Sequence, residues 1–433
     1  MNKIELIGQY IDVYNETLEN GLKVYLVPYT NKNNYYITCG TKFGSINLEF
    51  TVDGKKKKVP AGVAHFLEHK MFETADGKNP FDFFSKSGSS CNASTGYQKT
   101  RYLVEGNKNI EENLEYFLSY INGLYCTDEL VEKEKGIIIE ELKMYQNNPA
   151  WQIDHELSKS TFDIHPIKID IGGTIESVKA TTKEDLYTCY NAFYQPSNMV
   201  LAVAGNFDRD KILEIIKKHP LLNSRIEKVK VGTKKPNEKE KIVTKKKTIS
   251  IPTLTVPKLA LAVKTKVTDY QSLPVFLFRS YTIMIANILY DQSALFREEM
   301  LRKKLMTSLN SNVLWIDDIL LMEFNADTDK PEELAKEIVN HFKNTKITSE
   351  ELERYKKVWI SSSIYGADSI STMANNIVNV VLEYDELIEE HWIESIRSMN
   401  IEDLEKIRNI INIDNTTAII ANPTEKTAKN EDC

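Results

Sequence analysis

Residues 61–72 read Ala61-Gly-Val-Ala-His-Phe-Leu-Glu-His-Lys-Met-Phe72, and their centre is the pentad His65-Phe-Leu-Glu-His69. Two histidines four positions apart on a helix point about 40° apart, so both imidazoles project from one face. Glu68 lies on the same side, three residues after His65. Such a set is typical of a catalytic zinc site, in which the nitrogens bind the metal and the carboxylate takes a proton from water.

The structural alternative is a core helix whose histidines bond to backbone or carboxylate groups. The apolar residues around the pentad indicate that the helix is buried: they are Val63, Ala64, Phe66, Leu67 and Met71. Three polar side chains that face inward need partners, and one metal ion satisfies all three. We therefore favour the metal site, in the inverted order H-x-x-E-H rather than H-E-x-x-H.

A zinc site with two histidines needs a third protein ligand and an open position for water. The predicted helix 129–145 carries four candidate glutamates, Glu132, Glu134, Glu140 and Glu141. Glu134 and Glu141 are seven residues apart and share one face, although the glutamates could equally form a solvated face of the helix. His155 and His165 are weaker candidates, because neither has a partner at metal-binding spacing.

Length and composition describe a soluble globular protein of at least two domains. The chain has 433 residues, 42% hydrophobic and 27% charged, with a formal net charge of −7 that argues against general nucleic-acid binding. Five scattered cysteines indicate reduced thiols: Cys39, Cys91, Cys126, Cys189 and Cys433. The first residues lack a signal-peptide apolar region, and no apolar run is long enough to span a membrane. We expect a cytoplasmic protein without a membrane partner.

The order of predicted elements indicates a duplication. Strands are expected at 21–28, 34–43, 46–52, 89–95, 100–105 and 199–205, and helices at 111–124, 129–145 and 182–194. Lys55 to Lys58 is expected to be a solvated loop, and Ser224 to Lys247 a hydrated linker rich in lysine and glutamate. The second half repeats the pattern, with the buried helix 276–290 in the place of the metal helix but without its histidines.

The sequence therefore predicts an α+β fold made of two homologous α/β domains of roughly 200 residues each. The N-terminal domain is expected at 1–222 and carries the zinc site. A charged linker is expected at 223–256, and a C-terminal domain without metal ligands at 257–433.

Several segments together resemble the pitrilysin-type (M16) zinc peptidases, a family that includes insulin-degrading enzyme and the mitochondrial processing peptidase. They are Gly62 to His69, Asn92-Ala-Ser-Thr95, Glu134-Lys-Gly-Ile-Ile-Ile-Glu-Glu141 and Phe193-Tyr-Gln-Pro-Ser-Asn-Met199. The wording of 66–72 is most similar to small bacterial members of subfamily M16B, of the YmfH type. The resemblance covers essentially the whole chain and implies a pitrilysin-like fold for both domains.

The resemblance also implies residue roles. It implies Zn²⁺ binding by His65, His69 and Glu141, general-base catalysis by Glu68, and orientation of a ligating histidine by Glu134. Glu140 is the rival of its neighbour Glu141 as the third ligand. Asn92 and Ala93 would lie on an edge strand that pairs with the backbone of a peptide substrate.

One part of the family pattern differs in this chain. Family members carry an arginine and a tyrosine, seven residues apart, that assist the reaction from the second domain. Arg302 is the candidate for the arginine, but Leu309 stands seven residues later and no tyrosine is near. We therefore expect a heterodimer with a related subunit that supplies the Arg/Tyr pair; a homodimer is the other option.

The function expected from these features is zinc-dependent endopeptidase activity on unfolded peptides, with this chain as the catalytic subunit. Two alternatives remain at this point. One is a dedicated maturation peptidase for a bacterial ribosomal peptide, which would use the same chemistry on one substrate. The other is a non-catalytic structural homologue, which the intact set His65, Glu68, His69 and Glu141 disfavours.

Overall fold

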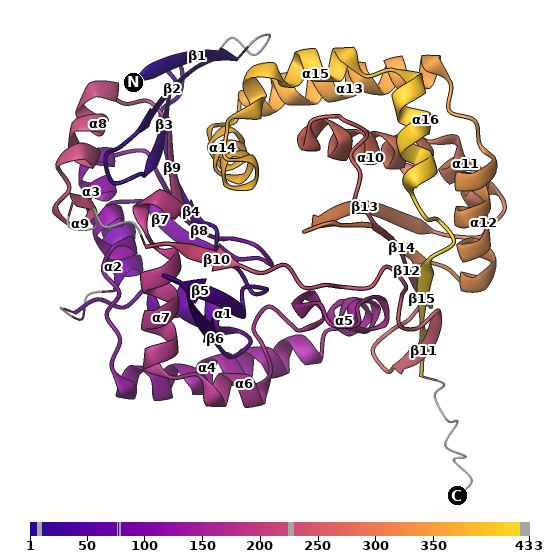
Figure 1. Cartoon of the computed structure of the whole chain (residues 1–433), viewed down its shortest axis with the longest axis horizontal. Coiled ribbons are helices and arrows are strands. Elements are labelled where there is room, and N and C mark those ends of the chain that lie inside the picture. Colours follow the sequence, from indigo (N-terminus) through magenta and orange to yellow (C-terminus); the bar gives the residue numbers. More distant parts are fainter. Residues whose placement is uncertain (7–10, 76, 78, 224–228, 425–433) are drawn as a thin grey trace, which may run out of the picture. The chain divides into compact units, whose positions relative to one another are not determined.

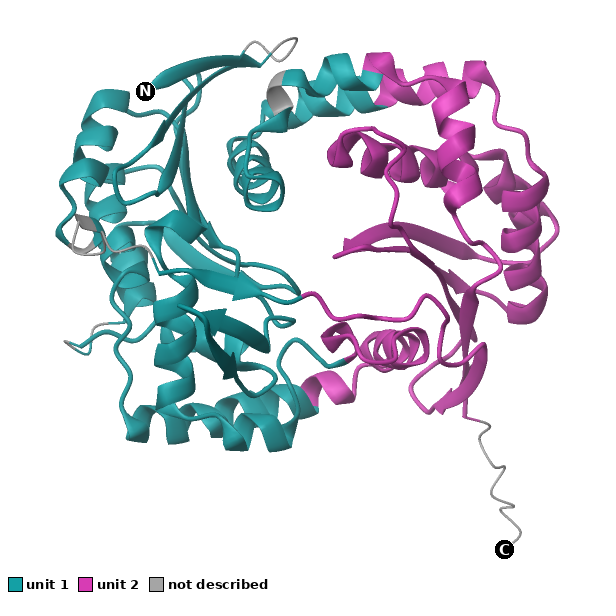
Figure 2. Ribbon diagram, in the orientation of Figure 1, with its two compact units in different colours: residues 1–143, 169–234, 359–396 teal, residues 144–168, 235–358, 397–433 magenta. Residues whose placement is uncertain are grey.

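The structure is a computed structural model that describes all residues except 7–10, 76, 78, 224–228 and 425–433. The chain forms two compact units (Figure 2). Unit 1 consists of residues 1–143, 169–234 and 359–396, and unit 2 of residues 144–168, 235–358 and 397–433. Within the described residues, no helix combines the length and the apolar character needed to span a bilayer.

Unit 1 is built on a seven-stranded sheet in the order β1-β2-β3-β9-β4-β8-β7 (Figure 1). Its strands are β1 (Asn2–Leu6), β2 (Ile11–Thr17), β3 (Lys23–Pro28), β4 (Tyr35–Thr41), β7 (Ser90–Thr95), β8 (Thr100–Gly106) and β9 (Met199–Gly205). All seven residues of β9 are buried, as predicted for a strand covered on both faces. A small second sheet contains β5 (Glu49–Val52), β6 (Lys55–Lys58) and β10 (Val231–Thr233).

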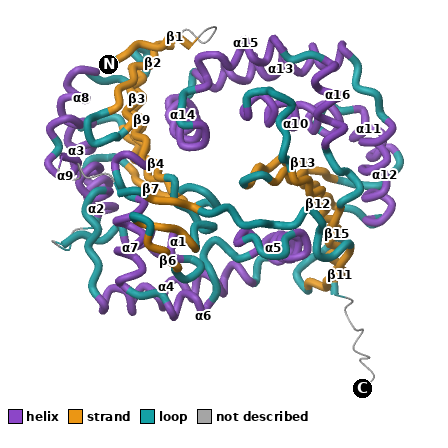
Figure 3. Tube along the Cα trace, in the orientation of Figure 1, coloured by secondary structure: helices purple, strands orange, loops and turns teal. Residues whose placement is uncertain are grey.

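Helices cover both faces of this sheet (Figure 3). The unit contains α1 (Val63–Lys70), α2 (Pro80–Lys86), α3 (Ile110–Ile121), α4 (Asp128–Gln146), α6 (Ile175–Ala180), α7 (Lys183–Phe193), α8 (Arg209–Lys218), α9 (Pro220–Asn223), α14 (Ile370–Tyr384) and α15 (Trp392–Ser398). Helices α1, α3, α7 and α8 share the larger core with the sheet, and α14 packs on the opposite face. At Gly40 a Cβ would lie 2.6 Å from Leu382 of α14, so glycine permits this close approach.

Unit 2 repeats this plan with a five-stranded sheet in the order β11-β15-β12-β14-β13. Its elements are α5 (Pro149–Thr161), β11 (Lys246–Ile251), β12 (Lys258–Lys266), α10 (Val275–Tyr290), α11 (Leu295–Arg302), β13 (Ser308–Ile316), β14 (Ile319–Asp327), α12 (Pro331–Asn344), α16 (Ile401–Ile410) and β15 (Thr416–Pro423). Helix α13 (Ser349–Ala367) begins in unit 2 and ends in unit 1. Helix α5 packs Ile153 and Leu157 onto one face of the sheet. Helices α10 and α12 contact strands of the same sheet.

The five strands of the unit 2 sheet have the same topology as β3-β9-β4-β8-β7 of the unit 1 sheet. Strand β3 is parallel to β9 as β11 is to β15, and the remaining pairs of β9-β4-β8-β7 and β15-β12-β14-β13 are antiparallel. The predicted pair of homologous α/β domains is therefore confirmed. The compact units nevertheless differ from the predicted division by sequence, because 144–168 belongs to unit 2 and 359–396 to unit 1. Helices α5 and α14 lie in these segments, and each completes a core by covering a sheet face.

One expectation for a charged segment was wrong, and a buried residue interrupts a second segment that is otherwise mainly exposed. Lys55–Lys58 is a strand, β6, because the Asp53-Gly54 turn folds it back onto β5 with Val52 opposite Lys55; its four lysines are exposed. The predicted hydrated linker contains Glu238, which is only 1% exposed. Glu238 accepts a hydrogen bond from Lys264 Nζ at 2.8 Å and others from the backbone N–H groups of Asp163 to His165. Residues 224–228 of that segment lie outside the described residues.

The segments that the structure describes after the last strand differ between the two repeats. In unit 1, β9 leads into α8, which packs beside α3 and buries Ile212 and Ile216. In unit 2, the described chain continues from β15 only to Thr424, without a further helix.

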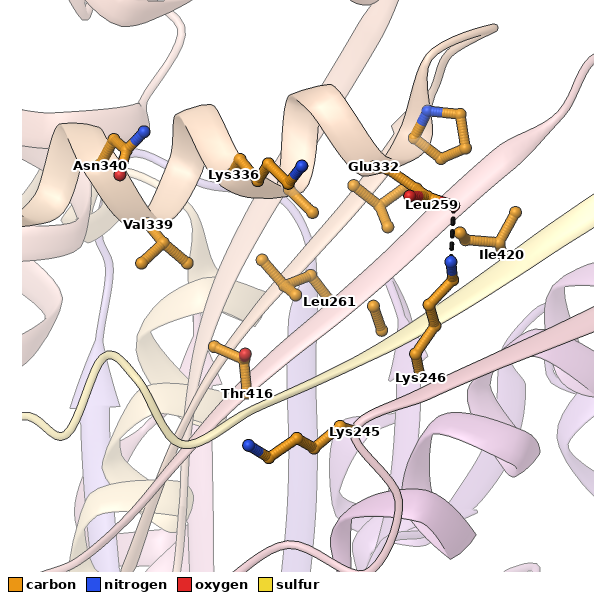
Figure 4. A pocket seen from close by; sticks show the side chains of 13 residues that line it. Lys245, Lys246, Leu259, Leu261, Glu332, Lys336, Val339, Asn340, Thr416 and Ile420 are labelled. Carbon is orange, nitrogen blue, oxygen red and sulfur yellow. Dashed lines mark hydrogen bonds and ion pairs between the residues drawn. The ribbon is translucent and has the colours of Figure 1, made fainter.

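A cavity of about 410 Å³ lies between α12 and the sheet of unit 2 (Figure 4). Its lining includes Leu259, Leu261, Ile420 and the ion pair of Lys246 with Glu332.

Candidate metal centre

Helix α1 presents its two histidines from a buried position in unit 1. Its inward stripe is formed by Val63, Phe66, Leu67 and Lys70, the spacing of one helical face. The helix begins after Gly62, which has φ +83°, and a Cβ there would lie 2.3 Å from the carbonyl oxygen of Gly172. Position 62 therefore requires glycine for two reasons: its backbone has a positive φ, and the backbone of Gly172 leaves no room for a Cβ.

Three side-chain atoms converge beside α1. Glu141 Oε2 lies 3.8 Å from His65 Nε2 and 3.6 Å from His69 Nε2. These separations are too long for hydrogen bonds. Zinc bonds of 2.0–2.2 Å in a tetrahedron place ligand atoms about 3.3–3.6 Å apart. Among the described residues, His65, His69 and Glu141 form the one group of three or more His, Cys, Asp or Glu side chains that could hold a metal ion.

Glu141 and Glu140, the two candidates for the third ligand, have different surroundings. Both residues lie on α4, but Glu140 points to solvent, with 72% of its side chain exposed, and pairs with Lys143 at 2.7 Å. Glu132 is likewise exposed and pairs with Lys135. Helical geometry accounts for the difference, because adjacent residues point about 100° apart.

The two other candidate histidines lie in unit 2 and make different contacts. The ring of His155 stacks on that of Trp151 at 4.6 Å between centroids. His165 is fully buried, with Nε2 3.2 Å from Asp317 Oδ2 and Nδ1 accepting the backbone N–H of Ile167. Both ring nitrogens of His165 therefore contact protein groups. His165 thus fits a buried histidine paired with carboxylate and backbone groups rather than a metal ligand.

Glu134 lies directly behind His69. Its Oε1 is 3.0 Å from His69 Nδ1, and its Oε2 is 3.3 Å from Lys70 Nζ. Burial opposes the charge of Glu134, but the contacts with His69 and Lys70 outweigh it and lower the pKa of this carboxyl. In a neutral His69 that carries its proton on Nδ1, this proton is donated to Glu134, and Nε2 faces Glu141 with a lone pair.

His65 and Glu68 are affected mainly by burial. Burial, assisted by the neighbouring His69, lowers the pKa of His65 to about 4, so its imidazole is neutral at neutral pH and has a lone pair to donate. His65 Nδ1 is buried and has no hydrogen-bond partner within the described chain. Burial is the largest influence on Glu68 and raises the pKa of its carboxyl. Glu68 Oε2 also accepts a hydrogen bond from the hydroxyl of Thr95.

The predicted substrate strand lies beside this group. Strand β7 contacts α1 and is the edge of the unit 1 sheet, paired with β8 alone among the described strands. Asn92 is exposed and Ala93 half-buried on β7, and Ala93 N–H donates to Asn92 Oδ1 at 2.8 Å. Arg302 lies elsewhere, exposed at the end of α11 in unit 2, and Leu309 is buried in β13 of the same unit.

Comparisons with known proteins agree with this arrangement. Residues 55–175 match the family described as insulinase, peptidase family M16, and residues 180–358 match the M16 inactive domain. The chain is 32% identical over 378 residues to YmfH of Bacillus subtilis (strain 168), described as an uncharacterized zinc protease; the match covers 84% of this chain and 86% of that protein. The chain belongs to the M16 peptidase family.

Solved structures share the M16 fold over nearly the whole chain. An M16-like peptidase from Alicyclobacillus acidocaldarius has a TM-score of 0.90 at 28% identity, covering 96% of this chain and 99% of that one. A protease from Helicobacter pylori has a TM-score of 0.82 at 21% identity, covering 95% and 99%. Pitrilysin, at 15% identity and a TM-score of 0.76, matches over 98% of this chain and 46% of its own length. The predicted pitrilysin-like fold is thus confirmed.

Two residues that contact this M16 site were not predicted from the sequence. Thr95 belongs to the segment Asn92–Thr95 that resembles the family, but its contact with Glu68 is not predicted by that resemblance; its hydroxyl reaches Glu68 because β7 runs past α1. Lys70 directly follows the pentad and is not part of the H-x-x-E-H pattern. A signal for Lys70 was present, because it falls seven residues after Val63 and three after Leu67, on the buried stripe of the helix. A lysine at such a position is rarely buried unless it is paired.

Proposed function

We propose that this M16 chain is a zinc-dependent endopeptidase. The observation that carries the proposal is the convergence of His65 Nε2, His69 Nε2 and Glu141 Oε2 at ligand–ligand distances, with the carboxylate of Glu68 on the same helix. YmfH, which is similar to this chain over 84% of its length, is described as a zinc protease. This description supports zinc as the metal. Two imidazoles and one carboxylate are also a donor set used by catalytic zinc peptidases.

His65, His69 and Glu141 would hold the zinc ion, and Glu134 would fix the ring of His69. The ion, once bound, supplies a Lewis acid for hydrolysis of a peptide carbonyl. Glu68 then acts as the general base: its carboxylate takes one proton from the attacking water as the oxygen bonds to the carbonyl carbon. Glu68 returns that proton to the nitrogen of the leaving amine as the C–N bond breaks, so the carboxylate is regenerated.

The substrate is proposed to be an extended peptide that pairs with β7. An edge strand offers unpaired backbone groups to a partner strand, so it binds peptides with little dependence on their side chains. Asn92 and Ala93 lie at the centre of β7, three and two residues before Thr95, whose hydroxyl contacts Glu68. A bound peptide would therefore be held close to the general base. Dedication to a single precursor peptide is the narrower form of the same proposal.

A second subunit is proposed to complete the reaction. The attacked carbonyl acquires negative charge, and donors beyond the metal stabilise it. Arg302 is not followed by a tyrosine seven positions later, because Leu309 stands there. We therefore propose a heterodimer with a related M16 chain that supplies the Arg/Tyr pair, with a homodimer as the alternative assembly.

The function is tested by comparing wild type with Glu68→Gln, each assayed with the partner subunit where one is found. We expect both proteins to bind one zinc ion per chain and only wild type to hydrolyse a mixed peptide library. Hydrolysis by Glu68→Gln at the wild-type rate would remove Glu68 from the mechanism. A zinc-loaded wild type that cleaves no peptide, alone or with a partner, would favour the non-catalytic structural homologue.

A further inference from the structure

A lysine lies buried immediately behind the metal centre. The side chain of Lys70 has 0% exposure, although it follows directly after His69 on α1. Its ammonium group contacts Glu73 Oε1 at 2.6 Å, Glu134 Oε2 at 3.3 Å and the backbone carbonyl of Leu130 at 3.2 Å. Three acceptors thus surround the three N–H donors of this group, which is how a buried ammonium is stabilised.

These contacts join Lys70 to the metal centre through one carboxylate. Glu134 accepts one hydrogen bond from His69 Nδ1 with Oε1 and another from Lys70 Nζ with Oε2. Each of its two oxygens is therefore held by a different side chain. Without a cation at Oε2, one oxygen of the buried Glu134 carboxylate would lack a hydrogen-bond partner. Its present orientation would then be less stable, and the side chain of Glu134 would rotate to pair that oxygen elsewhere. The carbonyl of Leu130 further ties Lys70 to α4, the helix that carries both Glu134 and Glu141.

From this arrangement we propose that Lys70 is a positioning residue for the metal centre, which acts by fixing Glu134 and, through it, the ring of His69. Lys70 does not contact the three candidate ligand atoms. Its role is to hold Glu134 in place before the metal binds, so that His69 Nε2 is already directed toward Glu141. This inference rests on the proposed zinc site and adds a residue that the H-x-x-E-H pattern does not include.

The test is a double-mutant cycle on zinc affinity, measured by competition with a chromogenic chelator. Lys70→Met keeps a long unbranched side chain and removes the charge. We expect it to weaken zinc binding about tenfold to a hundredfold, the range for residues that orient a ligand. If Lys70 acts through Glu134, adding Lys70→Met to Glu134→Gln should cause less than a twofold further loss. Unchanged zinc affinity in Lys70→Met, or the same loss in both backgrounds, would overturn the proposal.

The chain offers a matched control in unit 2. Lys264 and Glu238 form another fully buried pair, with 0% exposure of both side chains, in the unit that carries none of the three candidate metal ligands. Lys264→Met should lower stability and leave zinc affinity at the wild-type value. If Lys70→Met does not fold, Lys70→Gln, which keeps a donor but no charge, takes its place in the same cycle. Failure of wild type to bind zinc would contradict the proposed metal site, whereas unchanged affinity in the variants would contradict only the role of Lys70.

Discussion

The hydroxyl of Thr95 donates a hydrogen bond to Oε2 of Glu68. This contact links the edge strand β7, which is proposed to bind substrate, to the proposed general base on α1. The hydroxyl of Thr100 in turn lies 3.4 Å from that of Thr95 and donates to the backbone carbonyl of Phe43. Thr95 thus ties the carboxylate of Glu68 to the sheet by one hydrogen bond, which favours one orientation of that carboxylate.

The first prediction concerns Thr95. Replacement by valine keeps the shape and removes the hydroxyl, and a hydrogen bond to a charged group is worth about 1.5–3 kcal/mol. We expect Thr95→Val to lower kcat about tenfold to a hundredfold, with zinc content unchanged, and Thr95→Ser to retain most of the activity. Steady-state kinetics at several pH values would measure this. A wild-type kcat in Thr95→Val would show that the hydroxyl of Thr95 does not assist Glu68.

A second prediction separates the two adjacent glutamates of α4. Glu141→Gln should weaken zinc binding by more than about a hundredfold, because even the loss of a residue that only orients a ligand costs about 10–100-fold. Glu140→Gln is the control and should bind zinc as wild type does, since Glu140 is 72% exposed and pairs with Lys143. Chelator competition on both variants measures the difference. Full zinc occupancy in Glu141→Gln would exclude it as the third ligand.

Local patterns in the sequence were sufficient to predict the repeated strands and the helix that carries His65 and His69. The His65–His69 spacing and the run Met199–Gly205 each depend on one element and its periodicity. The choice between Glu140 and Glu141 required the family resemblance, because the third ligand comes from a different helix and its direction depends on how α4 packs against α1. The structure brings Glu141 to the two histidines.

Features that depend on distant segments were not predictable in this way. Glu238 lies among lysines and glutamates, and nothing near it in sequence indicates that Lys264 and three backbone N–H groups will surround it. The assignment of α5 to unit 2 likewise follows from contacts of Ile153 and Leu157 with a sheet whose strands begin about a hundred residues later. A single sequence contains no local signal for such pairings.

The third prediction concerns acid stability. Burial alone would raise the pKa of Glu238, but the Lys264 ammonium and the backbone N–H groups outweigh it and lower the pKa to about 2, from an ordinary value of 4.5. A depressed carboxyl pKa stabilises the fold above pH 4.5, and this contribution is lost as pH falls toward 2. We expect wild type to lose on the order of 3 kcal/mol over this window through Glu238.

Glu238→Gln removes this titration, so its stability should change less over the same pH window. Urea unfolding monitored by hydrogen exchange in β12 would measure the difference. Glu332→Gln is the control, since its pair with Lys246 is half exposed and such pairs contribute little. If the free energy of unfolding depends on pH in Glu238→Gln as it does in wild type, Glu238 does not contribute to the acid sensitivity of the fold.

A fourth prediction addresses the edge strand. A peptide that pairs with β7 uses backbone N–H groups of alternate residues, because successive residues of a strand point their N–H groups to opposite edges. In a cleaved peptide, N-methylation at every second position near the scissile bond should therefore raise KM at least about tenfold, as one or more hydrogen bonds are lost. Methylation of the intervening positions is the control. Losses that do not alternate would argue against pairing with β7.

The last prediction concerns the second subunit. Because Leu309 stands where a tyrosine is expected after Arg302, the isolated chain should bind zinc normally and hydrolyse peptides slowly. Addition of a related M16 chain that carries the Arg/Tyr pair should raise kcat by about 10²–10³-fold, the usual effect of one oxyanion donor. A partner with tyrosine changed to phenylalanine is the matched control and should assemble without restoring the rate. Full activity of the isolated chain would refute the heterodimer, and full activity accompanied by self-association would favour the homodimer.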